Sequence, residues 1–157
     1  FVASMVYNGK YAFVTGGYPE RHILAIRPEG SGNITETHIA WRVKKGASYV
    51  PSPVVVGPYF VIAADNGIAS CFKAEDGTRL WMERLGGGHS ASAITAGGLA
   101  YFVSDRGITS IIKPSPNFEV VAKNDLKELV SSSPAVSQGQ IFIRGHKHLY
   151  CIGKKTN

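Results

Sequence analysis

The residue types that could do chemistry are few in this sequence and stand far apart. Cys71 and Cys151 are the only cysteines, and 80 residues separate them. In His146-Lys147-His148 the two histidines share one face of an extended strand, but no further ligand stands nearby to complete a metal site. His89-Ser90 would offer a base and a nucleophile without a recognisable third group to orient the base. The sequence therefore predicts no catalytic residue, no metal ligand and a solvated turn at residues 146–148.

The net charge of +6 raises the question of an anionic ligand. The 17 Lys and Arg are scattered, and the densest basic sites are the pairs Lys44-Lys45 and Lys154-Lys155. Nucleic-acid-binding proteins gather such residues on one face or in one tract, so no nucleic-acid partner is expected. Gly86-Gly87-Gly88 leads into no helix and is interpreted as a flexible link, not a phosphate cradle. No stretch approaches the roughly 20 apolar residues of a transmembrane helix.

A period of about 40 residues organises the chain and sets the positions of these side chains. The recurring features are Trp41 and Trp81, Asp65-Asn66-Gly67 and Asp105-Arg106-Gly107, and the segments 51–55, 91–95 and 132–136, with 2–6 as a weaker copy. We predict a single domain over residues 1–157, built from repeats at about 2–50, 51–90, 91–131 and 132–153.

Short apolar runs with a period of two residues predict β-strands within each repeat. In the second repeat the expected strands cover 54–56, 59–64, 68–72 and 79–83, and Asn66-Gly67 is a favoured hairpin turn. The fourth repeat yields only three strands, and the first carries a surface excursion at 28–36. Because one four-stranded sheet cannot cover both of its apolar faces, such units stack around an axis. The sequence thus predicts an all-β propeller of about four blades.

The segment Cys71–Trp81 resembles the A-L-D-A-x-T-G-K-x-x-W repeat of the pyrroloquinoline-quinone-type (PQQ-like) β-propellers. The matching residues are Ala74, Gly77 and Trp81, whereas Lys73, Asp76 and Thr78 replace the usual Asp, Thr and Lys. In that family the Trp ring packs onto the next blade near its Gly. The resemblance therefore implies that Trp41, Gly77 and Trp81 dock neighbouring blades.

Propellers of this family have seven or eight blades, so the resemblance implies that this chain is the C-terminal part of a larger ring. The remaining blades are expected upstream, and the full protein's N-terminus would complete the fourth blade. Its strand over 148–152 is then expected to be unpaired on its outer side. The resemblance also implies a bacterial, periplasmic or secreted location.

Two functions are compatible with this resemblance. The first is a non-catalytic repeat scaffold for protein or ligand interaction, as in the propeller lipoprotein of outer-membrane assembly. The alternative is part of a quinone-dependent alcohol or sugar dehydrogenase. Such an enzyme would need an adjacent Cys-Cys pair, a calcium-holding set of Glu, Asn and Asp, and an Asp base, all of which would have to lie outside this chain. We favour the scaffold, with no cofactor and no activity in this chain.

A protein partner or small ligand is expected at the mouth of the propeller channel, by analogy with other propellers. Links between blades share a face with the hairpins between second and third strands, and the first strands line the axis. Tyr49, His89 and Val130 are repeat-equivalent and enter those first strands. The candidate binding residues are Lys45, Tyr49, His89, Ser90, Arg106 and Arg144.

The two cysteines occupy one position of the repeat. Ala25, Cys71, Ile111 and Cys151 share that position of the third strand, so a whole blade separates Cys71 from Cys151. A disulfide requires Cα atoms within about 7 Å. We therefore expect two buried free thiols.

Overall fold

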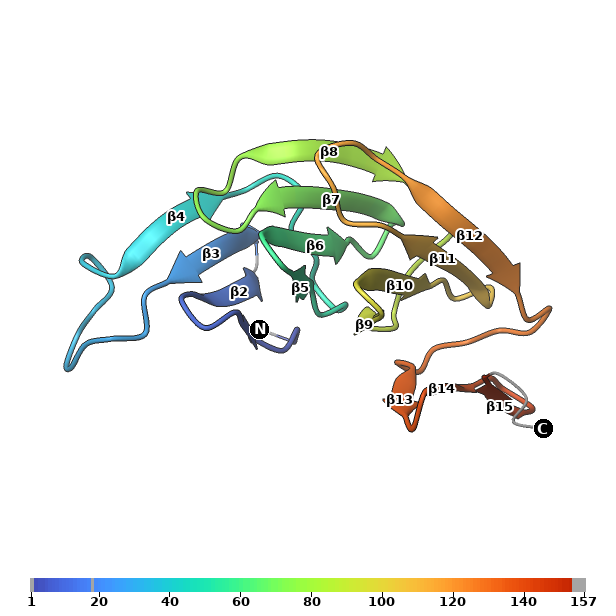
Figure 1. The fold of residues 1–157 in the computed structure, drawn as a ribbon. Helices are drawn as coiled ribbons and strands as arrows, with labels where there is room; N and C mark the ends of the chain where they lie inside the picture. Colours follow the sequence, from blue (N-terminus) through green and yellow to red (C-terminus); the bar gives the residue numbers. More distant parts are fainter. Residues whose placement is uncertain (1, 18, 154–157) are drawn as a thin grey trace.

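The computed structural model describes residues 2–17 and 19–153, and its strands form four antiparallel sheets that fan out in an arc (Figure 1). Three sheets have four strands and the last has three. Every regular element within the described ranges is a strand. The predicted all-β architecture is therefore confirmed, including the shorter fourth unit.

Each sheet, or blade, contains strands that follow one another in the sequence. Blade 1 contains β1 (Val6–Tyr7), β2 (Ala12–Gly16), β3 (His22–Ile26) and β4 (Ile39–Val43). Blade 2 contains β5 (Val54–Val56), β6 (Tyr59–Ala63), β7 (Ile68–Lys73) and β8 (Arg79–Arg84). Blade 3 contains β9 (Ile94–Ala96), β10 (Leu99–Val103), β11 (Ile108–Ile112) and β12 (Val120–Asp125). Blade 4 contains β13 (Ala135–Ser137), β14 (Gln140–Arg144) and β15 (Leu149–Ile152).

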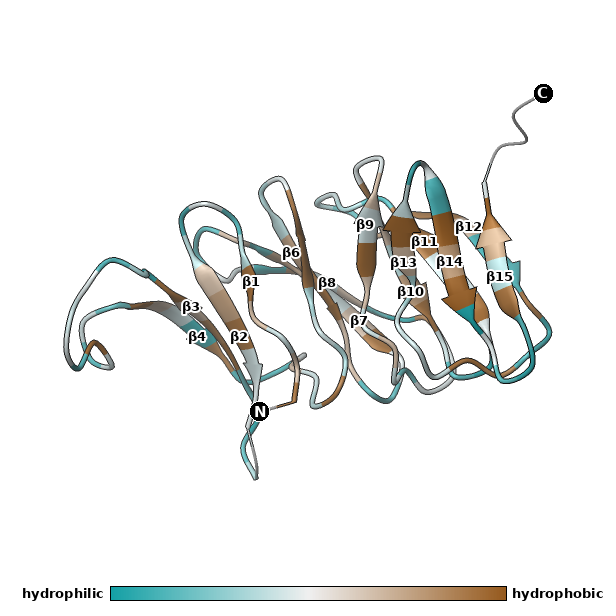
Figure 2. Cartoon of the chain, turned by 90° about the horizontal axis from the view of Figure 1, so that it is seen from below, coloured by the Kyte–Doolittle hydropathy of each residue, from teal (hydrophilic) through white to brown (hydrophobic). Residues whose placement is uncertain are grey.

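The short first strands lie at the inner side of the arc, where β1 contacts β5, β5 contacts β9 and β9 contacts β13. Apolar residues follow the strands, whereas hydrophilic residues concentrate in the connecting loops (Figure 2). The turn between β6 and β7 shows the local cause of a hairpin. Gly67 has a φ of +78° and its N–H donates to the Ala64 carbonyl at 2.8 Å. Glycine adopts this left-handed conformation without a Cβ penalty.

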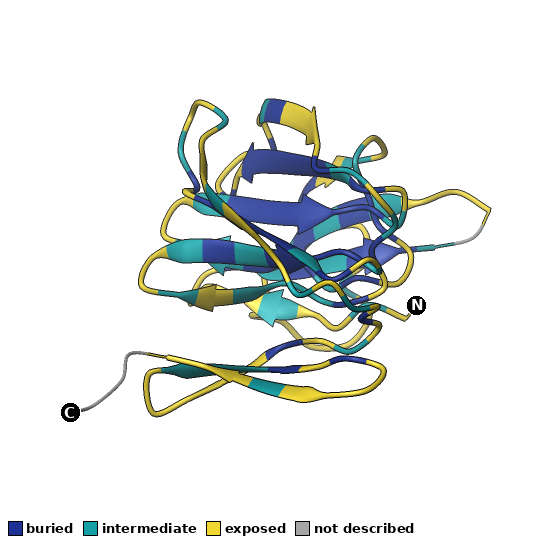
Figure 3. Ribbon diagram, turned by 90° about the vertical axis from the view of Figure 1, so that its right-hand side faces the viewer, coloured by how far each residue is buried: buried dark blue, intermediate teal, exposed yellow. Residues whose placement is uncertain are grey.

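The apolar core is divided among the three interfaces between neighbouring blades. The buried residues of interface 1/2 are Tyr11, Phe13, Ile23, Ala25, Trp41, Ala47, Phe60, Ile62, Phe72 and Ala74. Those of interface 2/3 are Val54, Val61, Ala63, Ala69, Cys71, Trp81, Leu85, Ala100, Phe102 and Ile112. Among the described residues, the buried cluster of interface 3/4 is smaller and consists of Ala91, Val103, Val130 and Ile143. Burial therefore decreases toward blade 4, whose strands are largely exposed (Figure 3).

Trp41 reaches from the outer strand of blade 1 to the loop between β7 and β8. Its indole N–H donates to the Ala74 carbonyl at 3.0 Å. The ring lies against Gly77, where an added Cβ would stand 2.7 Å from two ring atoms. Gly77 also has a φ of +72°, so both its space and its backbone require glycine.

Trp81 makes the equivalent contact one blade further on. Its indole N–H donates to the Ser115 carbonyl at 3.1 Å, and its ring packs edge-on against Phe118 with 5.0 Å between centroids. Trp81 is 7% exposed. Both tryptophans thus place a hydrogen-bonded aromatic ring across the boundary to the next blade.

Blade 3 has an alanine where the first two blades have tryptophan. Trp41 pairs with Ala25 and Trp81 with Cys71, whereas the same register in blade 3 pairs Ala122 with Ile111. Interface 3/4 therefore lacks the ring that spans the other two interfaces.

The two cysteines are both free, but only one is buried. Burial raises the pKa of the Cys71 thiol to about 12. Cys151 is exposed, which corrects the prediction of two buried thiols. Its strand, β15, pairs only with β14 among the described residues, so its outer edge has no neighbouring strand to cover it.

Candidate functional site: the hairpin face

One face of the fold collects the links between blades and the hairpins between second and third strands; we name it the hairpin face. Its links are residues 44–50, 86–90 and 125–131, and its hairpins are 16–17 with 19–21, 65–67, 105–107 and 145–147. Backbone hydrogen bonds join the link 86–90 to the hairpins on both sides. The His89 N–H donates to the Asp65 carbonyl at 3.0 Å, and the Asp105 N–H donates to the Gly88 carbonyl at 2.8 Å.

The next link repeats this arrangement. The Val130 N–H donates to the Asp105 carbonyl at 3.1 Å, and the His146 N–H donates to the Leu129 carbonyl at 3.0 Å. Links and hairpins therefore form one continuous hydrogen-bonded belt over blades 2 to 4. Side chains on this belt stand on a fixed backbone, which lowers the entropic cost of binding.

Two aspartates, 40 residues apart, hold the links that enter their own blades. The Asp65 carboxylate accepts hydrogen bonds from the N–H groups of Tyr49 at 2.9 Å and Val50 at 3.0 Å. The Asp105 carboxylate accepts one from the Ser90 N–H at 2.8 Å. The sequence predicted these aspartates as turn residues, but their second function in fixing the links was not foreseen.

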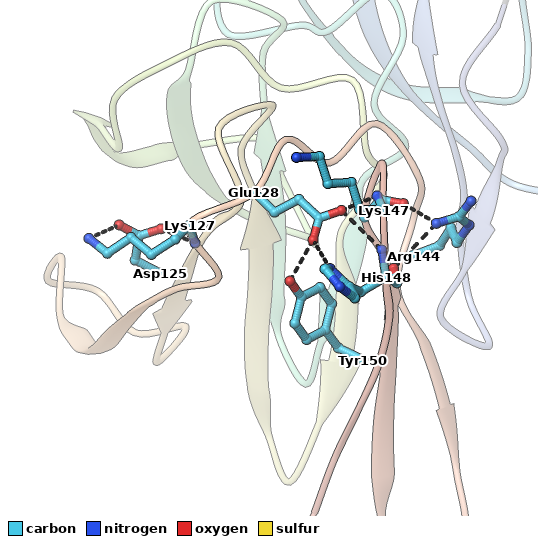
Figure 4. Close-up of polar contacts among 8 residues, drawn as sticks. Asp125, Lys127, Glu128, Arg144, Lys147, His148 and Tyr150 are labelled. Carbon is cyan, nitrogen blue, oxygen red and sulfur yellow. Dashed lines mark hydrogen bonds and ion pairs between the residues drawn. The ribbon is translucent and has the colours of Figure 1, made fainter.

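In blade 4 the two partners exchange their parts. The hairpin carries no aspartate, and the carboxylate comes instead from Glu128 of the link (Figure 4). The Glu128 carboxylate accepts hydrogen bonds from the backbone N–H groups of Lys147 and His148. It also accepts one from His148 Nδ1 at 2.8 Å and one from the Tyr150 hydroxyl at 2.6 Å. The turn at 146–148 is therefore tied to the link, while its three residues are exposed, which agrees with the predicted solvated turn.

These hydrogen bonds change the acidity of both partners. They lower the pKa of Glu128 to about 2, and the bond from Tyr150 is the largest cause. The same bond raises the pKa of Tyr150. The carboxylate therefore stays ionised at all ordinary pH values and remains a strong acceptor for blade 4.

Lys45 and Tyr49 lie exposed on the link from blade 1 to blade 2. The Arg21 guanidinium lies 5.7 Å from the centre of the Tyr49 ring and 3.2 Å from the Asp65 carboxylate. Lys45 and Arg21 line one recess of about 270 Å³, together with Met82. Arg21 is thus a neighbour of two candidates, although the sequence analysis did not single it out.

Ser90, Arg106 and Arg144 are exposed further along the hairpin face, in blades 3 and 4. Arg106 follows the aspartate that holds Ser90. The Arg144 guanidinium donates to the carbonyl oxygens of Gly145 and His148, so it bends over the blade 4 hairpin. The five exposed candidates are therefore spread along the same face, from the link between blades 1 and 2 to blade 4.

His89 is not at the surface, contrary to its expected place at the channel mouth. It is 2% exposed, and neither ring nitrogen has a hydrogen-bond partner among the described residues. Burial lowers its pKa, while the charge of Asp105 acts in the opposite direction. Its repeat-equivalent Val130 is fully buried, so of the three predicted mouth residues only Tyr49, at 38% exposed, reaches solvent. Hydrogen bonds hold the links around His89 and Val130 between two hairpins, which draws these residues inward.

A row of serines along the inner strands was missed by the sequence analysis. The N–H of Ser4 donates to Ser52 Oγ at 2.8 Å, that of Ser52 to Ser92 Oγ at 3.0 Å, and that of Ser92 to Ser133 Oγ at 2.9 Å. Each bond joins equivalent serines of two neighbouring repeats and so crosses one interface between blades. The four serines line a groove of about 580 Å³ along the first strands. The signal was present, because one serine recurs in every repeat.

Within residues 2–17 and 19–153, no three His, Cys, Asp or Glu side chains gather closely enough to hold a metal ion. The part of the chain that the structure describes contains no helix with the length and apolar character needed to cross a membrane.

No protein-family model and no curated protein matches the sequence, but solved structures do match the fold. BamB from Moraxella catarrhalis matches with a TM-score of 0.71 and 10% identity, covering 94% of this chain and 41% of BamB. A europium-containing methanol dehydrogenase matches with a TM-score of 0.60 and 12% identity, covering 77% of this chain and 24% of the dehydrogenase. The chain thus spans less than half the length of either protein. At these identities the likeness shows the fold, which is that of PQQ-like propeller blades.

Proposed function

We propose that this chain is part of a non-catalytic binding scaffold that holds an acidic segment of a protein partner on its hairpin face. The observation that carries the proposal is the belt of hydrogen-bonded links and hairpins, which presents exposed basic residues from three blades. Those residues are Lys45, Arg106, Arg144 and Lys147.

Several other cations of this region are already neutralised. Lys44 pairs with Glu20 at 2.8 Å, and Lys127 pairs with Asp125 at 2.6 Å. Within the described residues Lys45, Arg106 and Lys147 form no ion pair. Cations without an internal partner supply the electrostatic complementarity that steers and orients an acidic partner.

The preferred test uses a fluorescein-labelled octaglutamate peptide as a probe of acidic segments. Fluorescence anisotropy would measure its affinity for the chain and for the double variant Lys45→Glu/Arg106→Glu. We expect at least tenfold weaker binding, because two cations of the belt become anions. The matched control is Lys73→Glu/Lys123→Glu, which changes the net charge equally at exposed strand positions outside the hairpin face.

The control decides whether the hairpin face or the overall charge binds the probe. Affinity within about twofold of the original chain in the control supports the hairpin face. Equal losses in both double variants would show attraction to the net charge alone and would reject the proposal. Far-ultraviolet circular dichroism of each variant checks that the blades remain folded.

The scaffold proposal also includes an extracytoplasmic location. The alternative to it is that the full-length protein is a quinone-dependent dehydrogenase. Adding PQQ and calcium to the full-length protein would produce dye reduction with an alcohol or sugar if the alternative were correct. A scaffold gives no such reduction. Fractionation of cells that produce the full-length protein tests the location.

A further inference from the structure

A cavity of about 420 Å³ lies between blades 3 and 4; we name it the 3/4 cleft. Its lining residues are Ile94, Tyr101, Val103, Thr109, Ile111, Asn124, Leu126, Pro134, Ile141, Ile143 and Ile152. None of these residues is charged, and most are aliphatic. The cavity shares Leu126 with the hairpin face and Ile94 with the serine groove, but its other lining residues belong to neither.

The 3/4 cleft is the counterpart of the packed core at interface 2/3. Strand register shows which residue of interface 2/3 and which residue of interface 3/4 occupy the same position of the repeat. With the residue of interface 2/3 first, these pairs are Val54 and Ile94, Val61 and Tyr101, Ala63 and Val103, Ala69 and Thr109, Cys71 and Ile111, Ala100 and Ile141, and Phe102 and Ile143. The first member of each pair is buried at interface 2/3. At interface 3/4, Ile94, Tyr101 and Ile111 are only partly buried. The same positions thus form a closed core in one interface and an open cleft in the next.

The open interface is also the one without a tryptophan, and Ala122, which stands at the tryptophan position, pairs with Ile111 of the cleft lining. At interface 2/3 the Trp81 ring crosses to the next blade, and its N–H is bound by the Ser115 carbonyl. At interface 3/4 the equivalent residue is Ala122. A buried aromatic side chain covers about 150–250 Å² of surface, and alanine leaves most of that area without a partner. The space in the 3/4 cleft is therefore broad and apolar, and it is bordered by the sheets of blades 3 and 4.

We propose that the 3/4 cleft binds a neutral, flat aromatic molecule of two or three rings with one hydrogen-bonding group. The size of the cleft is within the range of about 300–1,000 Å³ that is typical of small-molecule sites. Its uncharged lining excludes a strongly ionic ligand, because a buried charge would lack a partner. Thr109 and Asn124 line the cleft, and their hydroxyl and amide groups would supply the polar contact.

The test uses prodan, an uncharged two-ring fluorophore with one carbonyl acceptor, whose emission shifts to the blue in apolar surroundings. Titration of the chain with prodan should give saturable, blue-shifted emission. Ala122→Trp should weaken this binding at least tenfold, because the new ring would stand beside Ile111, which pairs with Ala122 and lines the cleft, and would take up space there. The matched control is Val121→Trp, which adds the same ring at a neighbouring position that is 50% exposed. Val121→Trp should change the affinity by less than twofold.

A measurement on the unmodified chain covers the case in which Ala122→Trp does not fold. In methyl NMR spectra, prodan should shift the signals of Ile94, Ile111 and Ile143. The signals of Ile23 and Ile62, which are buried at interface 1/2, should not move. Shifts confined to other methyl groups, an absence of saturable binding, or equal losses in the two Trp variants would each overturn the proposal.

Discussion

Interface 2/3 and interface 3/4 join blades of the same topology with different chemistry. Interface 2/3 depends on apolar packing around Trp81, which is 7% exposed and contacts Phe118. Interface 3/4 has Ala122 at that position, a smaller apolar cluster around Val130, and the carboxylate of Glu128, which binds the blade 4 hairpin. The first contact is mainly hydrophobic, whereas the second combines fewer apolar residues with hydrogen bonds to a carboxylate.

The difference teaches that a repeat fold can keep its strand order while its stability varies along the chain. In repeat proteins, stability is approximately the sum of each unit and its nearest-neighbour interfaces. Blades 1 to 3 share two dense aromatic or aliphatic cores, whereas every residue of β13 is exposed in blade 4. Local opening should therefore begin at blade 4.

The largest expected effect comes from removing the ring at interface 2/3. Trp81→Ala should lower the free energy of unfolding by about 3–5 kcal/mol, as large truncations in a core do. The variant would make interface 2/3 resemble interface 3/4. Denaturant unfolding measures the loss, with Met82→Ala, at an exposed neighbouring position, as the control. A cost below about 1 kcal/mol would show that the ring does not dock the blades.

A second prediction separates contact with the Trp41 ring from backbone strain. Gly77→Ala should cost about 1–3 kcal/mol more than Gly57→Ala, because only the former forces a methyl group into the Trp41 ring. Both glycines have positive φ, but an added Cβ at Gly57 meets nothing within 4 Å. Thermal and denaturant unfolding of the two variants give the comparison. Equal costs would mean that backbone conformation alone explains the need for glycine at residue 77.

The repeat period predicted the strands well, because alternation and turn residues are local signals. The hairpin at Asp65-Asn66-Gly67 and the four-stranded blades could be placed from sequence alone. Burial of individual side chains was harder to predict, since it depends on the neighbouring blade. Cys71 and Cys151 share a repeat position, yet one lies inside an interface and the other on an edge strand.

The candidate site was predicted less completely for the same reason. The hairpin face was placed by topology, but His89 is buried because its link lies between two hairpins. Glu128 was missed, since its partners lie about 20 residues further along the chain in a turn that looked merely polar. Nothing in the spacing of Glu128 marks it as the carboxylate that replaces Asp65 or Asp105.

The third prediction concerns the acid sensitivity of interface 3/4. The folded-state pKa of Glu128, about 2, lies below the ordinary value of 4.5. Its contribution to stability is therefore complete above pH 4.5 and is lost as the pH falls toward 2. Hydrogen-exchange protection factors of β14 and β15 should fall over this range, while those of β6 and β7 change less.

The variant Glu128→Gln isolates this carboxylate from other acid effects. It should lower protection in β14 and β15 already at neutral pH and remove most of the decrease between pH 4.5 and 2. The comparison would fail if the acid profile of blade 4 were the same in the variant and in the original chain. Another titrating group would then be responsible.

The smallest expected effect concerns the serine row, which crosses interfaces 2/3 and 3/4 alike. Ser92→Ala removes the acceptor for the Ser52 N–H but keeps the bond from its own N–H to Ser133 Oγ. We expect a cost of about 0.5–1.5 kcal/mol, which is the usual net value of one hydrogen bond. The control is Ser90→Ala, because Ser90 bonds Asp105 through its backbone N–H, which the substitution preserves.

Ser133→Ala removes the corresponding bond at interface 3/4, which is the bond from the Ser92 N–H. If the row acts independently of the packing around it, Ser92→Ala and Ser133→Ala should cost the same. A smaller loss of unfolding free energy for Ser133→Ala would show instead that interface 3/4 relaxes around the missing hydrogen bond. The same hydrogen bond would then contribute less to stability where no tryptophan holds the two blades together.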